Sequence, residues 1–157
     1  MQPIAIKPKH FPWFDYSRYS FSLGVRVGDR VYLSGHTASE FDPALKRMVV
    51  KGGMTDQVRT AYQKIAAILD AAGMTMNDVV RVVEYVKPEG IERYAEARAV
   101  REEVFGTHQP AINTVPVRAL LRPEAFIEIE VTAGPVGAAT NVGSGMPVAR
   151  DSAGVVF

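Results

Sequence analysis

Two glutamates two positions apart are the first residues whose type and spacing suggest chemistry. Glu128 and Glu130 fall in residues 126–132, where polar and apolar side chains alternate. A period of two predicts a β-strand with one apolar face and one face that carries both carboxylates. Alternating charge is common on half-exposed strands, so this spacing alone is weak evidence for an acid–base site.

A third carboxylate, Glu84, interrupts the apolar run of residues 79–86. Such a run is typical of a strand that is covered on both faces. A carboxylate there costs free energy unless it is paired or keeps its proton. One interpretation is an acid or base tuned by its surroundings in a cleft between subunits. The others are an ion pair with an arginine across an oligomer interface, and a strand end exposed to solvent.

The elements that must position these residues follow from hydrophobic spacing and turn signals. Gly28-Asp29, between two alternating runs, predicts a hairpin over residues 23–34. Apolar residues at helical spacing predict an amphipathic helix over residues 55–72, which ends at Gly73. The other expected elements are strands at 4–6, 79–86, 112–120 and 126–132, a loop at 39–53 with a possible strand at 48–50, and a second helix at 91–105. This pattern predicts an α+β fold.

Composition narrows the classes of function. The chain of 157 residues has 18 lysines and arginines against 17 aspartates and glutamates, so no basic surface favours nucleic acid as a partner. It contains no cysteine, which excludes disulfides and thiolate chemistry and is typical of a reducing cytoplasm. No stretch approaches the roughly 20 apolar residues of a membrane helix, and the start does not read as a signal peptide. We therefore expect a cytoplasmic protein with no membrane partner, no metal and no cofactor.

The first 20 residues form an aromatic-rich segment. The aromatic side chains of this segment, continued one position beyond it, are Phe11, Trp13, Phe14, Tyr16, Tyr19 and Phe21. One interpretation is a loop that covers the core. The other is a pocket wall for a flat or apolar ligand, because aromatic side chains give a large contact area at low entropic cost.

Four short motifs then occur in order: Val27-Gly28-Asp29, Ser34-Gly35-His36, Ala71-Ala72-Gly73 and Ile127-Glu128-Ile129-Glu130. In this order and spacing they resemble the RidA family (also called YjgF/YER057c/UK114), small proteins that hydrolyse reactive enamines and imines. The resemblance covers residues 21–134 and leaves 135–157 as an extended tail. It implies a mixed β-sheet with two helices packed on one face, a chorismate-mutase-like fold, and a homotrimer with clefts between subunits.

The resemblance also implies roles for individual residues. Glu128 matches the glutamate that positions the hydrolytic water in active members. Phe21, Gly35 and His36 fall on pocket positions, with Phe21 in place of a tyrosine and His36 in place of a glutamine. Because the pKa of histidine lies near neutrality, His36 is a candidate general acid or base; the alternative is a structural loop residue. Glu84 or His36 would be the second acid–base group.

The chain departs from the family where the substrate carboxylate is bound. The family's arginine falls on Ile112, which cannot form a bidentate contact with a carboxylate. Asn113 and Thr114 follow it, and their backbone donors are candidates to face a ligand. Arg98 takes the place of a family asparagine near the pocket. It either restores the lost positive charge or is a solvated arginine on the helix surface.

Two functions are therefore expected. The first is an enzyme that deaminates an enamine, imine or related intermediate in a degradative pathway, with a small-molecule substrate larger or more apolar than the small 2-imino acids. The second is a non-catalytic trimer of the same fold that binds a metabolite or acts as a chaperone. Ribonuclease activity comes third, because the near-neutral charge counts against it.

Overall fold

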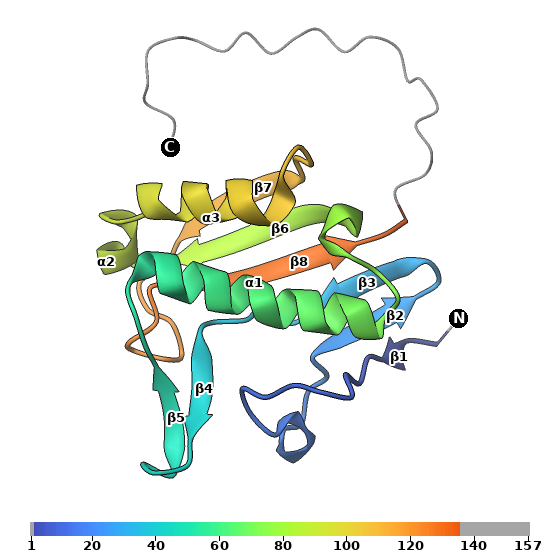
Figure 1. Ribbon diagram of the computed structural model, residues 1–157, viewed down its shortest axis with the longest axis horizontal. Coiled ribbons are helices and arrows are strands. Elements are labelled where there is room, and N and C mark those ends of the chain that lie inside the picture. Colours follow the sequence, from blue (N-terminus) through green and yellow to red (C-terminus); the bar gives the residue numbers. More distant parts are fainter. Residues whose placement is uncertain (1, 136–157) are drawn as a thin grey trace, which may run out of the picture.

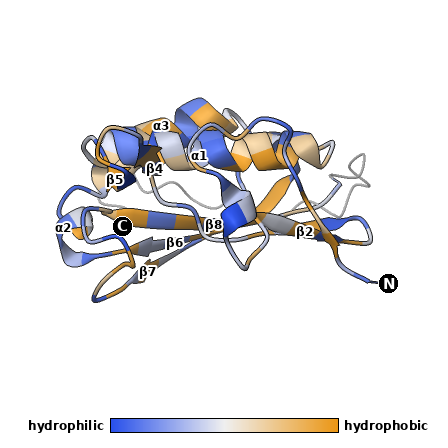
Figure 2. Cartoon of the chain, turned by 90° about the horizontal axis from the view of Figure 1, so that it is seen from below, coloured by the Kyte–Doolittle hydropathy of each residue, from blue (hydrophilic) through white to orange (hydrophobic). Residues whose placement is uncertain are grey.

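Two layers make up the molecule, a β-sheet and helices packed across one of its faces (Figure 1). The structure is a computed structural model that describes residues 2–135. In Figure 2 the helices α1 and α3 lie above the sheet, and within the described residues no helix lies on its other side. The predicted α+β class, with a mixed sheet and helices on one face, is confirmed.

Most strands precede the first long helix, and the remaining helices lie between the sixth strand and the last two strands. The strands are β1 (Ile4–Ala5), β2 (Gly24–Val27), β3 (Arg30–Leu33), β4 (Ser39–Asp42), β5 (Arg47–Val50), β6 (Val79–Val86), β7 (Ala111–Pro116) and β8 (Ile127–Ala133). The helices are α1 (Met54–Ala71), α2 (Pro88–Ile91) and α3 (Ala95–Phe105), with 3-10 turns η1 (Tyr16–Arg18) and η2 (Met76–Asp78). No helix in residues 2–135 is long and apolar enough to span a membrane.

The main sheet is mixed because one crossover interrupts an antiparallel arrangement. Its strands lie in the order β1-β2-β3-β8-β6-β7. β6 is antiparallel to β8 and parallel to β7, which the chain reaches through α2 and α3. A parallel neighbour requires a crossover of this kind. β8 therefore lies inside the sheet, and β7 forms one edge.

The alternation of side chains along β8 determines the face of the sheet on which each one lies. Its odd-numbered residues are buried against the helices, whereas Glu128 and Glu130 are half-buried on the other face, as predicted. α1 supplies the opposing apolar surface through the fully buried Val58, Ala61, Ile65 and Ile68. Burying one such aliphatic side chain larger than alanine contributes about 1.5–3 kcal/mol.

Three predicted boundaries were wrong. Residues 39–53 contain a separate two-stranded hairpin, β4 and β5, where a loop with one possible strand was expected. The second helix is divided into α2 and α3, because Pro88 begins a short helix of its own. β7 ends at Pro116 because its partner strand β6 ends at the paired residue, Val86, where the N–H of Val117 donates the last bond to the Val86 carbonyl at 2.9 Å. Residues 136–157, predicted as an extended tail, lie outside the described residues.

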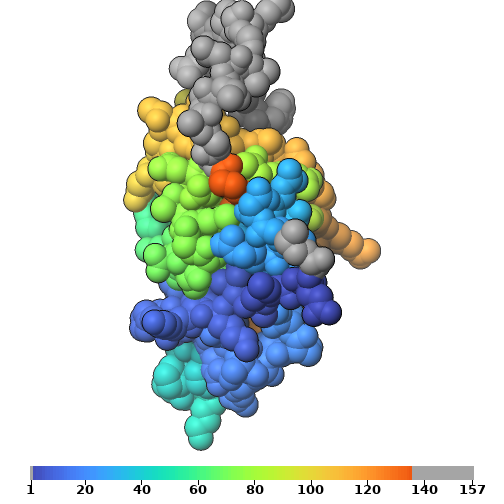
Figure 3. All heavy atoms as spheres, turned by 90° about the vertical axis from the view of Figure 1, so that its right-hand side faces the viewer, coloured from blue at the N-terminus to red at the C-terminus, as the bar shows by residue number. Residues whose placement is uncertain are grey.

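The N-terminal segment lies between the body of the molecule and the β4–β5 hairpin, as its dark blue and blue atoms show in Figure 3. Phe11 packs edge-on against Trp13, Phe14 and Tyr16, with ring centroids 4.9–5.9 Å apart. The N–H of Phe41 in β4 donates to the carbonyl of Trp13 at 2.6 Å. The segment is thus attached both to the core and to the hairpin.

Candidate functional site

A pocket of about 350 Å³ lies between the N-terminal segment and the start of β8. We call it the Glu128 pocket. Its walls include Phe14, Tyr19 and Phe21, residues 34–37, and the charged side chains of Arg122 and Glu128. It brings together four residues that the sequence singled out, namely Phe21, Gly35, His36 and Glu128. The aromatic segment therefore supplies a pocket wall as well as a cover for the core.

Backbone pairing and one glycine position the Glu128 side chain. The N–H of His36 donates to the carbonyl of Ile129 at 2.8 Å, and the N–H of Ile129 donates back at 3.0 Å. This pairing brings Gly35 beside Glu128, where a Cβ atom would overlap the carboxylate. Only glycine allows so close an approach without displacing that side chain.

The Glu128 carboxylate is half-buried and has no hydrogen bond or ion pair with the residues that the structure describes. Burial raises its pKa, and the negative charge of Glu130 raises it further. A higher pKa brings a carboxylate closer to the range in which a general base works best at neutral pH. Glu128 is therefore a candidate general base.

His36 is neutral at neutral pH. Only 3% of its surface is exposed, and burial, followed by the positive charge of Lys64, lowers its pKa from 6.5 to about 4. Its Nε2 is buried and has no hydrogen-bond partner in residues 2–135. A neutral imidazole still offers a donor and an acceptor nitrogen. His36 is thus a candidate hydrogen-bonding group, but it does not carry the charge of an imidazolium acid.

Lys64 lies behind the pocket, fully buried on α1. Its Nζ donates to the carbonyl of Thr37 at 2.8 Å and to that of Ser39, and it lies 5.4 Å from the centroid of the Phe14 ring. Burial lowers the pKa of Lys64 from 10.5 to about 7. Its donors hold the segment after His36, so this lysine supports the pocket wall.

Arg122 reaches the pocket from the loop between β7 and β8. It is half-buried, and its guanidinium has no hydrogen bond or ion pair with any described residue. Its charge is near enough to contribute to the lowered pKa of Lys64. Within residues 2–135, no group of three or more histidine, aspartate and glutamate side chains could hold a metal ion.

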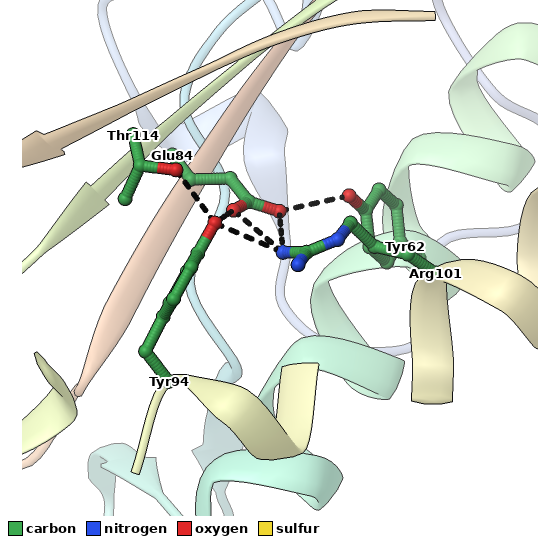
Figure 4. A network of polar contacts seen from close by, with 5 residues as sticks. All are labelled: Tyr62, Glu84, Tyr94, Arg101 and Thr114. Carbon is green, nitrogen blue, oxygen red and sulfur yellow. Dashed lines mark hydrogen bonds and ion pairs between the residues drawn. The ribbon is translucent and has the colours of Figure 1, made fainter. Parts of the chain in front are cut away.

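The other buried carboxylate, Glu84, lies in a polar network on the helix side of the sheet (Figure 4). It accepts a hydrogen bond from the hydroxyl of Tyr62 at 3.2 Å and from one guanidinium nitrogen of Arg101 at 2.9 and 3.1 Å. The hydroxyl of Tyr94 donates to it and also meets Oγ1 of Thr114 at 2.6 Å. The structure therefore shows an ion pair, within one chain instead of across an interface.

The sheet separates Glu84 from Glu128. In the β6–β8 ladder Glu84 is opposite Ile129, and Tyr85 is opposite Glu128. Residues directly opposite one another share a face, so Glu84 faces the helices and Glu128 faces away from them. One chain therefore does not bring Glu84 into the Glu128 pocket, contrary to the expectation that both would act on one substrate.

The remaining candidates also lie outside the pocket. Arg98 is on the solvent side of α3, where its Nε donates to Glu102 at 2.8 Å, as expected of a solvated helix arginine. Ile112, Asn113 and Thr114 are exposed on the edge strand β7. Since β6 lies between β7 and β8, about 10 Å of sheet separates these residues from the strand of the pocket.

Two charged residues at or behind the pocket escaped the sequence analysis. Lys64 lies three residues after Ala61 and four before Ile68, a spacing that places it on the buried face of α1 and was the available signal. Arg122 stands in a loop, and local sequence does not tell whether a loop side chain turns toward a pocket or toward solvent.

This geometry defines a class of protein, the small α+β proteins with a mixed sheet, helices on one face and a strand glutamate in a pocket. A family model described as "Endoribonuclease L-PSP" matches residues 16–134. The chain belongs to this family, which is also known as the RidA or YjgF family.

Curated relatives and solved structures agree with this assignment. The chain is 34% identical to RutC family protein PH0854 of Pyrococcus horikoshii over 113 residues, which cover 72% of this chain and 85% of the relative. It is 33% identical to the 2-iminobutanoate/2-iminopropanoate deaminase of Salmonella typhimurium, over 70% of this chain and 83% of the relative. Rv2704 of Mycobacterium tuberculosis, described as a member of the YjgF/YER057c/UK114 family, has a TM-score of 0.66 at 30% identity, with 85% and 100% of the two chains covered.

Proposed function

We propose that this protein is a deaminase that hydrolyses the C=N bond of an imine, or of the enamine that interconverts with it, and releases ammonia. The observation that carries the proposal is Glu128, a half-buried carboxylate with no partner among the described residues and a raised pKa, in a pocket. Two relatives are named 2-iminobutanoate/2-iminopropanoate deaminase, which supports this reaction class. The glutamate needs only to move protons, so the chemistry requires no other catalytic group from the chain.

Glu128 serves as base and then as acid. As the oxygen of a bound water forms a bond to the carbon of the protonated imine, Glu128 takes a proton from that water, and the electron pair of the C=N bond moves to nitrogen. The product is a carbinolamine. Glu128 then returns its proton to the nitrogen, the C–N bond breaks, and the hydroxyl oxygen forms the new C=O bond. The hydroxyl proton leaves with the ammonia as ammonium.

The pocket favours a substrate larger and more apolar than the 2-iminobutanoate and 2-iminopropanoate in those relatives' names. Phe14, Tyr19 and Phe21 form much of its wall. Apolar and aromatic walls with a few polar groups are typical of sites that bind small organic ligands. Small imino acids would leave most of this wall without contact.

We further propose a homotrimer in which β7 lies at the subunit interface. All six residues of β7 are exposed at the sheet edge, and the apolar side chains of Ile112 and Val115 are 38% and 37% exposed. An exposed edge strand with apolar side chains favours aggregation, and a subunit contact that covers the strand prevents it. Light scattering during size-exclusion chromatography should give three times the chain mass; a monomer at micromolar concentration would contradict this assembly.

The reaction is tested with imines generated in situ by an amino-acid oxidase from alanine and from phenylalanine. Wild-type protein should accelerate loss of the phenylalanine-derived imine above the spontaneous rate, and Glu128→Gln should remove the acceleration. Glu130→Gln is the matched control, because Glu130 lies on the same strand face but does not line the pocket. If wild type binds the 2-oxo acid product but accelerates neither imine, the protein is a non-catalytic binder of the same fold.

A further inference from the structure

The Glu128 pocket contains a positive charge that the proposed hydrolysis does not use. Arg122 lines the pocket and forms no hydrogen bond or ion pair with any described residue. The donors of the neighbouring Lys64 are already used within the protein, because its Nζ donates to the carbonyls of Thr37 and Ser39. An arginine stays charged at physiological pH, and its planar fork matches a carboxylate. Arg122 is therefore available to bind an anionic group.

We propose that Arg122 binds the carboxylate of the substrate while Phe14, Tyr19 and Phe21 hold a flat apolar group, which makes the substrates aromatic 2-imino acids. The identity of the reaction rests on the proposed function; the binding of an aromatic carboxylate does not. The carboxylate contact thus comes from a loop, whereas the family resemblance places it on the strand position that Ile112 now occupies. The missing arginine changes the place of this contact and does not abolish it.

The two charges of the pocket suit such a substrate because they remain apart. Arg122 and Glu128 both line the pocket, yet they do not form an ion pair with each other. In a 2-imino acid the carboxylate is bonded directly to the carbon that water attacks. A guanidinium that holds the carboxylate therefore fixes the position of that carbon, and a separate carboxylate remains free to take the proton of water.

The aromatic wall accounts for the rest of the substrate. The ring centroids of Phe14 and Tyr19 are 5.4 Å apart, and those of Tyr19 and Phe21 are also 5.4 Å apart, so the three rings form one continuous surface. Lys64 lies against the Phe14 ring and fixes one end of this surface. A pocket of about 350 Å³ is at the small end of the range for ligand sites and suits a molecule with a single ring.

Arg98 provides a matched comparison. It is the arginine that the family resemblance places near the pocket, but it pairs with Glu102 on the solvent side of α3. Replacing Arg98 or Arg122 by methionine changes the net charge by the same amount. Only the second replacement removes a charge from the pocket wall.

Binding is measured by titration calorimetry with phenylpyruvate, pyruvate, phenylacetate and phenylacetamide. Wild type should bind phenylpyruvate more tightly than pyruvate, and phenylacetate more tightly than its uncharged amide. Arg122→Met should weaken phenylpyruvate binding by about tenfold or more and remove the preference for the acid. Arg122→Lys should recover part of that preference, and Arg98→Met should leave it unchanged. Phe21→Ala should reduce the preference for phenylpyruvate over pyruvate several-fold.

The outcomes separate this inference from the proposed function. An acid preference that survives Arg122→Met overturns the inference, and so does an equal loss in Arg98→Met, which would point to net charge alone. If binding depends on Arg122 but wild type does not accelerate imine hydrolysis, the proposed function fails and the binding inference stands. If hydrolysis occurs but carboxylate binding ignores Arg122, the reverse holds. Thermal unfolding of each variant confirms that the comparison is made on folded protein.

Discussion

Glu84 and Glu128 lie on neighbouring strands of one sheet, yet their surroundings differ in every respect that sets the behaviour of a carboxylate. Glu84 faces the helices, is fully buried, and accepts hydrogen bonds from two tyrosines and an arginine. Glu128 faces away from the helices, is half-buried, and has no partner among the described residues. The alternation of side chains along a strand produces the difference, since the β6 residue opposite Glu128 is Tyr85.

The contrast separates two uses of a buried charge. A carboxylate whose charge is balanced and whose lone pairs are satisfied is held in one arrangement and acts on structure. A carboxylate whose pKa is shifted by burial but which has no hydrogen-bond or ion-pair partner can accept hydrogen bonds from water or a ligand. A shifted pKa in a pocket therefore marks a candidate functional group. By sequence pattern Glu84 is the more unusual residue. By its surroundings Glu128 is the stronger candidate for a functional group.

The largest effect is expected from Glu84→Ala. It leaves Arg101 without its counter-charge and removes an acceptor from Tyr62 and Tyr94. Removing one partner of a buried pair costs about 3–5 kcal/mol. Because the Arg101 side chain is 18% exposed, the lower end of that range is expected for the loss in free energy of unfolding, measured with urea. A loss below about 1 kcal/mol would show that the network does not anchor the helices to the sheet.

Arg101→Met extends the same test. When both charges are removed, as in Glu84→Leu with Arg101→Met, no buried charge is left unpaired. The double variant should therefore be more stable than either of its single variants, Glu84→Leu or Arg101→Met. Strictly additive losses would mean that the two side chains do not interact energetically, and the contrast with Glu128 would lose its physical basis.

Glu128→Gln should affect activity and not stability, in contrast to Glu84→Ala. The hydrolysis rate should fall about 10²–10³-fold without a loss of stability. Burial raises the folded-state pKa of Glu128 above its unfolded value. The stability that accompanies such a shift is fully present below the unfolded pKa and is lost as the pH rises through the folded pKa. Glutamine does not ionise, so at neutral pH the variant should be at least as stable as wild type in urea unfolding. Marked destabilisation would assign Glu128 a structural role.

The pH–rate profile sharpens this prediction. Activity should rise with pH through the pKa of Glu128, because a general base must be deprotonated. Glu130 contributes to the raised pKa of Glu128, and its own carboxylate accepts from Tyr85 at 3.3 Å. Glu130→Gln should therefore move the rising limb to lower pH while leaving the plateau rate within a few-fold of wild type. A lower plateau with an unmoved limb would contradict the electrostatic role of Glu130.

The stability of the fold should depend on pH through His36, which lines the Glu128 pocket. Its pKa is lowered from 6.5 to about 4, chiefly by burial. A lowered histidine pKa favours the neutral form in the fold, so this stability is present above pH 6.5 and is lost as the pH falls toward 4. The loss should be about 3 kcal/mol by pH 4. The difference in melting temperature between wild type and His36→Gln should change as the pH falls from 6.5 to 4. A difference that stays constant over this range would contradict burial of a neutral imidazole.

The sequence predicted the helices and strands better than it predicted which residues contact the charged side chains. The period of two in residues 126–132 predicted both faces of β8 (Ile127–Ala133), and residues 79–86 form a strand with the predicted ends, because local pattern determines both. The partners of Glu84 were not predictable. Arg101 and Tyr62 lie 17 and 22 residues away on different helices, and only packing brings them together. The loop that returns Arg122 to the pocket likewise has no periodic signal.

The smallest effect, and the most specific to the Glu128 side, is expected from Gly35→Ala. The added methyl group would overlap the carboxylate, which is the far end of a flexible side chain and can rotate away without moving the backbone. The hydrolysis rate should fall about tenfold, because a displacement of roughly 1 Å of a catalytic group is costly, while the free energy of unfolding stays close to that of wild type. Turnover of the phenylalanine-derived imine and urea unfolding test the two halves of this prediction. If unfolding becomes easier and turnover does not change, Gly35 serves the backbone instead of the carboxylate, and the pocket tolerates more than one position of Glu128.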